Sequence, residues 1–290
     1  MRFCVCSWNK SRCFLFVGWV TYPVRVAVQI QPADTPDYAT WRQAVLRAEE
    51  IGVDVIFGYD HFHAPFIESI VDAKVVLAEV QPDVNNFEGW TALASWGEIT
   101  TRAELGLLVA GIGYRNPDLL ADMARTVDHI SGGRAILGVG AGWYEKDYAT
   151  YGFEYGTVKS RADLFDEGLL RIERRLEVLQ PAPLRKIPIL IGGSGPKRTL
   201  PAVARHADIW HTFLPIDSYR EASARLAELA AGFGRADSDI ERSTLWTDPQ
   251  SADGYLAAGA TLFHTEVRAA AGSYDLSTVE KLVEWRDTKR

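Results

Sequence analysis

The sequence predicts a single (β/α)8 barrel, also called a TIM barrel, preceded by an N-terminal extension. From Val24 onward, eight short apolar runs alternate with longer amphipathic stretches, a pattern typical of α/β folds. The apolar runs lack the in/out alternation of half-exposed strands, so they indicate parallel strands joined by crossover helices. Residues 24–290 match the usual length of such a barrel, about 250 residues. A doubly wound open sheet is the alternative.

The first half of the chain alternates three expected strands with three expected helices. Gly52 ends the first helix and the run Ser131-Gly132-Gly133 ends the third, because glycine readily adopts the conformation that follows a helix. A polar and aromatic loop is expected from His61 to Asn86. The expected strands are 24–30, 53–60 and 103–111, and the expected helices are 38–50, 90–101 and 117–130.

The second half continues the alternation with five further strands. The segment 147–157 contains Gly152 and Gly156 and has no helical period, so it is expected to be a loop, with the next helix beginning near Ser160. The expected strands are 133–142, 187–193, 207–213, 242–247 and 259–265, and the expected helices are 161–179, 199–206, 218–231 and 279–285.

Composition excludes several classes of protein. The formal charge of -7 and a pI near 5.5 argue against a protein that mainly binds nucleic acid or an anionic membrane surface. All three cysteines, Cys4, Cys6 and Cys13, lie near the start, so the main body can form neither an internal disulfide nor a cysteine-rich metal site. This cysteine usage predicts a reducing, cytoplasmic location.

The first 23 residues are expected to be an extension that is disordered or not part of the domain, which would span 24–290. A secretory signal is the alternative, because the segment has a basic start and a short apolar run from Phe14 to Val20. No A-x-A-like cleavage site precedes Val24, which favours the extension. No other segment approaches the roughly 18–20 apolar residues that cross a membrane.

The glycine turn "GVGAGW", residues 138–143, resembles a dinucleotide-binding fingerprint at first sight. That fingerprint requires G-x-G-x-x-G with the last glycine opening a helix, and here Trp143 occupies the third glycine position. The spacing therefore excludes the dinucleotide site. There is also no G-x-S-x-G motif and no Walker lysine, and the carboxylates Asp60, Glu145 and Asp147 show no pattern that would indicate a glycosidase.

Candidate chemistry lies where strands end, because the carboxyl ends of barrel strands form the active face. His61 follows the second strand in the run "DHFH" and is the best candidate for holding or donating a proton, with Asp60 orienting its loop. His63 is too close in sequence to His61 to indicate a metal site, and no further ligands have suitable spacing. Trp143 fits either a wall for a flat ligand or a plug for the barrel mouth.

The run "IGGSGPKRT" is the clearest candidate for phosphate binding. It joins a strand to a helix whose free N–H groups favour an anion, and its glycines allow close approach of the backbone. Ser194 and Thr199 add hydroxyl groups, and Lys197 or Arg198 adds positive charge. A tight turn that uses glycine only for backbone freedom is the alternative.

The stretches "YDHF", "GYRNPDLLADMARTVDHISGGRAILGVGAGW", "YGFEYG" followed by "SR", "IPILIGGSGPKRTL" and "ARHADIW" resemble the luciferase-like monooxygenase family, and most closely its branch dependent on the deazaflavin coenzyme F420. The resemblance runs from about Val24 to the C-terminal "VEWRD". It implies a luciferase-like barrel that holds a flavin-like ring in its mouth and a small-molecule substrate. Family members are often dimers, so a homodimer is left open.

The resemblance also implies roles for individual residues. His61 matches a histidine that lies near the ring and the substrate, and is the implied catalytic residue. The third strand end is expected to support the ring, often through a non-proline cis peptide. The carboxylate that sugar-phosphate dehydrogenases of the family carry after the fourth strand is replaced by Trp143, so glucose 6-phosphate is a doubtful substrate; Glu145 is the nearby alternative carboxylate. The implied cofactor-binding residues are His61, Leu108, Val109, Ala110, Ala141, Gly142, Trp143, Gly192, Gly193, Ser194, Gly195 and Thr199.

Three functions are compatible with the sequence. The first is hydride transfer between F420 and a small organic substrate, with His61 positioning or transferring the accompanying proton. The second is an FMN-dependent monooxygenase that uses oxygen, since the two cofactors share a tricyclic ring and a phosphate. The third is a non-catalytic binding or storage barrel. The basic set Lys159, Arg161, Lys197 and Arg198 could hold the acidic tail of F420, which weakly favours the first function.

Overall fold

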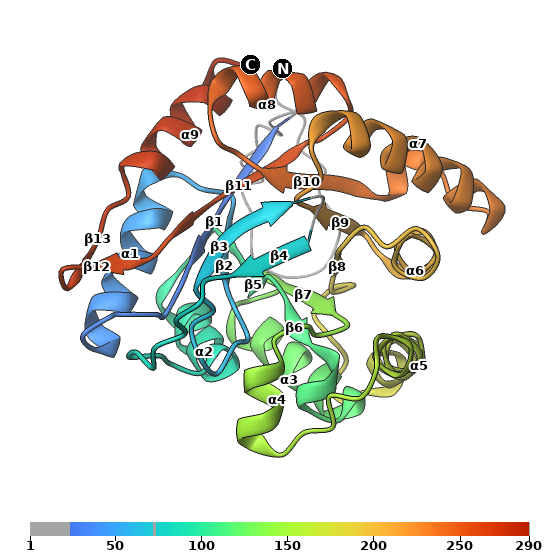
Figure 1. The fold of residues 1–290 in the computed structure, drawn as a ribbon, viewed down its shortest axis with the longest axis horizontal. Coiled ribbons are helices and arrows are strands. Elements are labelled where there is room, and N and C mark those ends of the chain that lie inside the picture. Colours follow the sequence, from blue (N-terminus) through green and yellow to red (C-terminus); the bar gives the residue numbers. More distant parts are fainter. Residues whose placement is uncertain (1–23, 72–73, 290) are drawn as a thin grey trace, which may run out of the picture.

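A closed barrel of eight parallel strands organises the molecule (Figure 1). The computed structural model describes residues 24–71 and 74–289. Pairing of β5 with β7 closes the ring, so the predicted barrel is confirmed and the open sheet was not the right alternative. In the order in which they pair, the strands are β5 (Glu104–Leu107), β2 (Val55–Gly58), β1 (Arg25–Ile30), β11 (Leu262–Val267), β10 (Glu241–Leu245), β9 (Ile209–Thr212), β8 (Ile189–Gly192) and β7 (Ala135–Gly140).

Helices connect the strands and surround the barrel, as Figure 1 shows. The predicted helices 117–130 and 199–206 are confirmed with the same bounds. Gly52 follows the first helix with φ of 108°, the left-handed conformation expected for it. The helices are α1 (Tyr38–Ile51), α2 (Gly89–Ile99), α3 (Pro117–Ile130), α4 (Glu145–Tyr151), α5 (Val158–Val178), α6 (Thr199–His206), α7 (Ile216–Gly232), α8 (Pro249–Ala257) and α9 (Ser277–Asp287).

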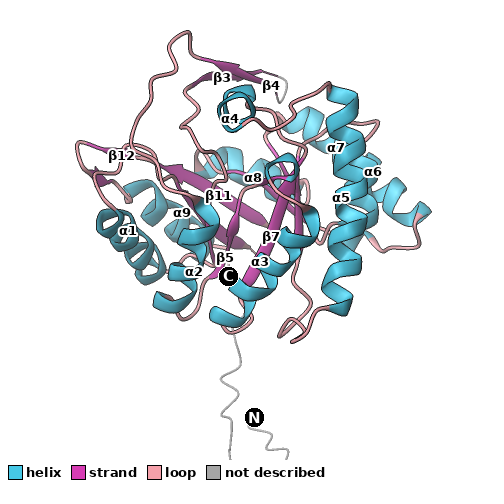
Figure 2. Cartoon of the chain, turned by 90° about the horizontal axis from the view of Figure 1, so that it is seen from below, coloured by secondary structure: helices cyan, strands magenta, loops and turns pink. Residues whose placement is uncertain are grey.

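Several elements differ from the predictions. The expected loop at 147–157 begins instead within helix α4, whose seven residues are too few to show a helical period in the sequence. The expected loop between His61 and Asn86 contains an antiparallel ribbon of β3 (Ile67–Val71) and β4 (Lys74–Leu77), which projects from the barrel end that carries α4 (Figure 2). Helix α8 was not predicted. Residues 1–23 lie outside the described residues, so the expected extension stays a prediction.

A small apolar cluster fills the interior of the barrel, inside the main core between strands and helices. Side chains alternate between the two faces of a strand. A residue that follows a cluster member by two positions, toward the carboxyl end, therefore also faces the interior. In five strands those positions hold polar residues or glycine, namely Gln29, Gly138, Gly192, His211 and His264. The interior is therefore apolar at its centre and polar near the candidate site. The cluster consists of Ala27, Val55, Phe57, Leu108, Ile136, Leu190, Ile209 and Leu262.

The glycines of β7 make room for the neighbouring strand. A Cβ atom on Gly138 would lie 2.0 Å from the carbonyl oxygen of Leu107, and one on Gly140 would lie 2.8 Å from a methyl carbon of Val109. Neither contact is tolerable without movement of the neighbour. The turn "GVGAGW" therefore uses these glycines for close packing against the segment that follows β5.

We expect Gly138→Ala to lower the free energy of unfolding by about 1–3 kcal/mol, because the backbone carbonyl of Leu107 must shift. Urea denaturation measures the change. Gly192→Ala is the matched control, since its Cβ would lie 3.5 Å from the nearest side-chain atom, an ordinary contact. Equal destabilisation by the two substitutions would contradict this account.

The side chain of Glu49 fixes the entry into β5. Its carboxylate accepts backbone N–H groups from Thr101 at 3.0 Å, Arg102 at 2.7 Å and Ala103 at 2.9 Å. Burial raises the pKa of Glu49, but these three hydrogen bonds favour the charged form and the net pKa is lowered. A lowered native pKa means that the stabilisation is present above the ordinary value near 4.3 and is lost as the pH falls through the native value.

Glu49→Gln is therefore expected to cost about 1 kcal/mol of unfolding free energy at pH 7 and progressively less as the pH falls below about 4.3. Urea denaturation over a pH series tests this. Glu50→Gln is the control, because that exposed neighbour only pairs with Arg47 on the surface. A cost that stays constant from neutral to acidic pH would refute the assignment.

Candidate active site

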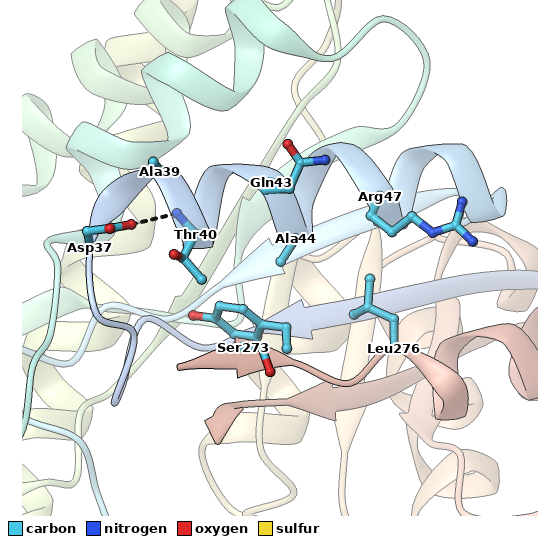
Figure 3. Close-up of a pocket in the computed structure, with 9 residues that line it drawn as sticks. Asp37, Ala39, Thr40, Gln43, Ala44, Arg47, Ser273 and Leu276 are labelled. Carbon is cyan, nitrogen blue, oxygen red and sulfur yellow. Dashed lines mark hydrogen bonds between the residues drawn. The ribbon is translucent and has the colours of Figure 1, made fainter. Parts of the chain in front are cut away.

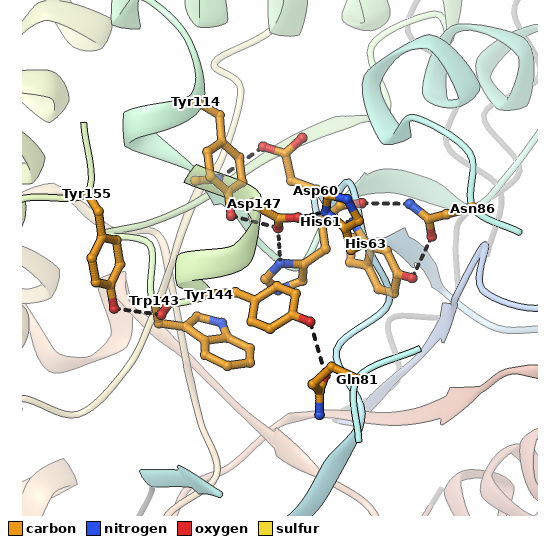
Figure 4. Close-up of polar contacts among 12 residues, drawn as sticks. Asp60, His61, His63, Gln81, Asn86, Tyr114, Trp143, Tyr144, Asp147 and Tyr155 are labelled. Atoms are coloured by element: carbon orange, nitrogen blue, oxygen red, sulfur yellow. Dashed lines mark hydrogen bonds and ion pairs between the residues drawn. The ribbon is translucent and has the colours of Figure 1, made fainter. Parts of the chain in front are cut away.

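Polar and aromatic side chains from three strand ends meet at one face of the barrel (Figure 4). Asp60 and His61 follow β2, and Tyr114 ends a 3-10 helix that follows the two-residue strand β6 (Ala110–Gly111). Trp143 and Asp147 follow β7, the latter in helix α4. This is the face formed by the carboxyl ends of the strands, where barrel enzymes carry their active sites.

Asp147 is the centre of this cluster. One carboxylate oxygen lies 2.8 Å from Nδ1 of His61 and accepts the hydroxyl of Tyr114 at 3.0 Å. The other lies 2.8 Å from Nδ1 of His63 and accepts the backbone N–H of the same residue at 3.0 Å. The carboxylate is fully buried. A buried carboxylate that accepts four hydrogen bonds holds both imidazole rings in fixed orientations.

This arrangement sets the protonation of the rings. Because a carboxylate only accepts hydrogen bonds, Nδ1 of His61 and of His63 must each carry a proton, and Nε2 remains for a ligand. Burial raises the pKa of Asp147, but the hydrogen bond and charge of His61 and the hydrogen bonds of His63 and Tyr114 outweigh it, so the net pKa is lowered. The ionised Asp147 can therefore stabilise a positive charge that forms on His61.

Aromatic rings enclose His61. Tyr59, Trp143 and Tyr144 meet its ring edge to face, with centroids 5.3–5.5 Å away. Trp143 is 37% exposed, which places it at the solvent side of the group, while Tyr144 is buried. The surroundings leave the His61 side chain 17% exposed. His61 is thus accessible to a ligand from a limited direction.

Asp60 binds the segment that follows β5, and its predicted role in orienting the loop of His61 stays a prediction. Its carboxylate pairs with both terminal nitrogens of Arg115, at 2.5 and 2.9 Å, and accepts the backbone N–H of Gly111 at 3.0 Å. Burial raises the pKa of Asp60, whereas Arg115 and the Gly111 N–H act in the opposite direction. The pair ties the end of β2 to the segment that follows β5.

The segment after β5 contains a cis peptide bond between Leu108 and Val109. The resemblance implied such a bond in this segment. The buried side chain of Gln29, in β1, donates a hydrogen bond to the Leu108 carbonyl at 2.8 Å. This hydrogen bond holds the peptide group between Leu108 and Val109 in place. Val109 packs toward Gly140 and Gly192, so the three strand ends β5, β7 and β8 form one continuous surface.

The predicted phosphate turn lies between β8 and α6. Gly193 has φ of 118° and is held by the backbone of His211 at 2.9 Å and by the indole of Trp210 at 2.7 Å. A Cβ atom on Gly195 would lie 2.9 Å from the Thr199 hydroxyl, which explains the second glycine. Helix α6 begins without a side-chain cap. The Leu200 N–H donates to the Gly195 carbonyl at 3.0 Å and Pro201 has no N–H, so among the first three helical residues the Thr199 N–H is the candidate for binding an anion.

The basic residues near the turn are mostly engaged elsewhere. Arg198 pairs with Asp163 at 2.8 Å and Asp166 at 2.5 Å on helix α5. Arg161 donates to the Gly142 carbonyl at 3.2 Å and braces the end of β7. Lys197 is exposed and lines a surface hollow of about 280 Å³ near α6.

The residues predicted to bind the cofactor or act in catalysis fall into two groups that contact different parts of the barrel. The contacts of His61 link it to Trp143 and to Asp147, whereas the turn Gly192–Thr199 contacts β9. Glu145, the sequence alternative for a carboxylate, is exposed, and Asp147 occupies the buried position instead. The sequence analysis missed the roles of Asp147, Tyr114 and Gln29. A prediction of helix α4 would have indicated that Asp147 and Glu145 lie on different faces of a helix.

A second hollow lies on the outside of the barrel, away from this cluster (Figure 3). Its volume is about 480 Å³, and it is lined by helix α1, by Leu276 and by β13 (Ser273–Tyr274), the strand that pairs with β12 (Ala269–Ala270). None of the predicted site residues borders it. Within residues 24–71 and 74–289, no group of three His, Cys, Asp or Glu side chains could hold a metal, and no helix is long and apolar enough to cross a membrane.

The fold and the cluster define a barrel with a carboxylate–histidine pair at the carboxyl ends of its strands and a separate glycine-rich turn before α6. The family model of the luciferase-like monooxygenases matches residues 17–247. The chain belongs to this family, as the resemblance predicted.

Named relatives include oxidoreductases. A Mycobacterium tuberculosis protein, whose name assigns it provisionally to the coenzyme F420-dependent oxidoreductases, is 31% identical over 63% of this chain and 57% of its own length. A phthiodiolone/phenolphthiodiolone dimycocerosates ketoreductase of Mycobacterium bovis is 28% identical over 67% of this chain and 56% of its own length. The matched regions therefore span little more than half of these relatives.

Solved structures share the fold. An F420-dependent secondary alcohol dehydrogenase in complex with an F420-acetone adduct has a TM-score of 0.76 at 15% identity, covering 92% of this chain and 99% of that chain. The FMN-bound oxygenating constituent of 3,6-diketocamphane monooxygenase from Pseudomonas putida has a TM-score of 0.58 at 15% identity, covering 81% of this chain and 72% of that chain. At such identities the likeness shows the fold alone.

Proposed function

We propose that this chain is an F420-dependent oxidoreductase that transfers a hydride between the deazaflavin and a small organic substrate. The pair of His61 and Asp147 at the barrel mouth is the observation that carries the proposal. A histidine whose Nδ1 is fixed by a buried carboxylate, and whose Nε2 is left for a ligand, is suited to proton transfer near neutral pH.

The residues present fit a flavin-like cofactor with a phosphate. Gly193 and Gly195 bring the backbone close to the start of α6, where the N–H and hydroxyl groups of Thr199 could donate to the phosphate. The surface formed by Val109 with Gly140 and Gly192 would support a flat ring. The cofactor would supply or accept the hydride, and Trp143 with the other rings around His61 would limit access of water.

His61 would give a proton to the substrate, or take one from it, at Nε2. Asp147 would hold the ring and stabilise its positive form, while His63 and Tyr114 hold Asp147 in place. The named relatives support F420 rather than FMN, since the first relative's name includes coenzyme F420 and the structure with a TM-score of 0.76 contains it. FMN with oxygen is the second candidate, supported by the FMN-bound structure.

Fluorescence titration of the purified chain with F420 and with FMN tests the proposal. We expect F420 to bind more tightly than FMN, and Thr199→Val with Ser194→Ala to weaken F420 binding by removing hydroxyl groups near the phosphate. Preference for FMN, followed by substrate-dependent oxygen consumption, would favour the monooxygenase. Failure to bind either cofactor would favour the non-catalytic barrel.

A further inference from the structure

Two histidines face the barrel interior from strands β9 and β11, on the arc of the barrel that begins next to β8. His211 lies in β9 and His264 in β11, and each follows by two positions a residue of the interior apolar cluster, Ile209 or Leu262. Because side chains alternate along a strand, both histidines face the interior. Their ring centroids are 4.6 Å apart, and both side chains are buried.

Each ring is fixed at one nitrogen and lacks a hydrogen bond at the other. Nδ1 of His211 lies 3.0 Å from the Ser243 hydroxyl, and Nδ1 of His264 lies 3.2 Å from the Thr244 carbonyl. Among the described residues, neither buried Nε2 atom has a hydrogen-bond partner. Buried polar atoms without partners are rare in native proteins, and a ligand could provide the missing hydrogen bonds.

The charges along this wall disfavour an anionic ligand. Burial lowers the pKa of His211 well below its ordinary value, and His264 lowers it further, so His211 is neutral. The Thr244 carbonyl only accepts, so Nδ1 of His264 carries its proton. Nε2 of His264 lies 3.5 Å from a carboxylate oxygen of Glu266, which is itself partly exposed toward the mouth. A proton on His264 would be balanced by the negative charge of Glu266. The wall therefore has no net positive charge whether or not His264 is protonated.

Arg268, which follows β11, has its charge balanced by an ion pair, although its Nε has no hydrogen-bond partner among the described residues. Arg268 pairs with Asp34 at 2.6 Å and lies over the ring of Phe66 at 4.2 Å. Two amide side chains lie beside Glu266: Gln31 donates to Gln29 at 3.2 Å and to Glu266 at 3.4 Å. The wall therefore offers neutral donors and acceptors beside one carboxylate.

We propose that His211 and His264 form a substrate-binding wall that selects an uncharged hydroxyl or carbonyl group and rejects carboxylates and phosphates. This inference rests on the proposed function, which places the cofactor on β5, β7 and β8. Strands β9, β11 and β1 then remain for the substrate. A hydroxyl group can donate to one Nε2 and accept from the other. A carboxylate or phosphate would face Glu266 without a free cation to offset the repulsion.

Nitrogen NMR of the full chain with ring-labelled histidine tests the wall without cofactor or turnover. Cyclohexanol and cyclohexanecarboxylate are the probes, since they share a ring and differ in charge. We expect cyclohexanol to shift the Nε2 signals of His211 and His264 in a saturable manner, and to bind at least about tenfold more tightly than the carboxylate. Equal or tighter binding of the carboxylate, or alcohol binding that leaves both signals unchanged, would overturn the proposal.

Two substitutions of His264 separate its nitrogens. Asn can replace the Nδ1 donor to Thr244 but lacks an atom at the Nε2 position, whereas Gln can place a polar atom there. We expect His264→Asn to weaken cyclohexanol binding about three- to tenfold and His264→Gln to retain more of it. Unchanged His61 signals would show that each variant is folded, and equal binding by both variants would contradict a role for Nε2. If a variant unfolds, the changes in the Nε2 signals of the unsubstituted chain still show whether the alcohol binds at the two histidines.

The outcome is independent of the cofactor titration. Alcohol binding at the wall without F420 binding would refute the proposed function and leave the binding preference intact. F420 binding together with a wall that prefers the carboxylate would refute this inference and leave the proposed function intact.

Discussion

Asp147→Asn is expected to lower turnover about 10²- to 10⁴-fold, the range associated with loss of general acid–base catalysis. The amide that replaces the carboxylate can donate toward His61, which disfavours the proton at Nδ1 and removes the negative charge that stabilises a protonated ring. It also disturbs His63 and Tyr114, which bind the same carboxylate. Affinity for the cofactor should change little, because the predicted phosphate turn does not contact Asp147.

The measurement compares kcat in the F420-linked assay with cofactor affinity from fluorescence. Glu145→Gln is the matched control, because this exposed carboxylate lies in the same first turn of α4 and faces solvent. Nitrogen NMR provides a readout independent of activity: the original chain should show His61 protonated at Nδ1, and Asp147→Asn should change that tautomer. Normal turnover in Asp147→Asn, or equal losses in both variants, would refute the role assigned to Asp147.

The strand ends were predictable because apolar runs mark buried parallel strands. His61 and Asp60 follow such a run directly, so the sequence placed them at the active face. The partner of His61 was not predictable in the same way. Asp147 lies in a seven-residue helix without a visible period, and only the folded turn shows that Asp147 faces inward while Glu145 faces solvent.

The interior histidines escaped prediction for a related reason. Parallel strands are apolar on both faces, so "IWHT" and "LFHTEV" do not reveal which residues face the interior. Register with the neighbouring strands settles this, since His211 pairs with Ser243 in β10 and with Gly192 in β8. Such register depends on closure of the barrel, which involves residues far apart in the sequence.

The pair of Arg115 and Asp60 should carry the largest single contribution to stability near the site. Arg115→Met is expected to lower the free energy of unfolding by about 3–5 kcal/mol, because it leaves the buried Asp60 carboxylate without its cation. The Gly111 N–H would remain bound to Asp60, so this single hydrogen bond would replace the ion pair as the contact of Asp60 with the segment after β5. Urea denaturation at pH 7 measures the loss.

A double variant separates the charge from the shape of the side chains. Asp60→Asn combined with Arg115→Met removes both charges, so we expect it to recover a substantial part of the loss, since a buried unpaired charge costs more than a missing pair. Arg47→Met is the surface control: its pairs with Glu50 and Glu280 are exposed and should contribute only about 0–1 kcal/mol. A double variant no more stable than Arg115→Met would mean that packing of the guanidinium, rather than its charge, stabilises this part of the site.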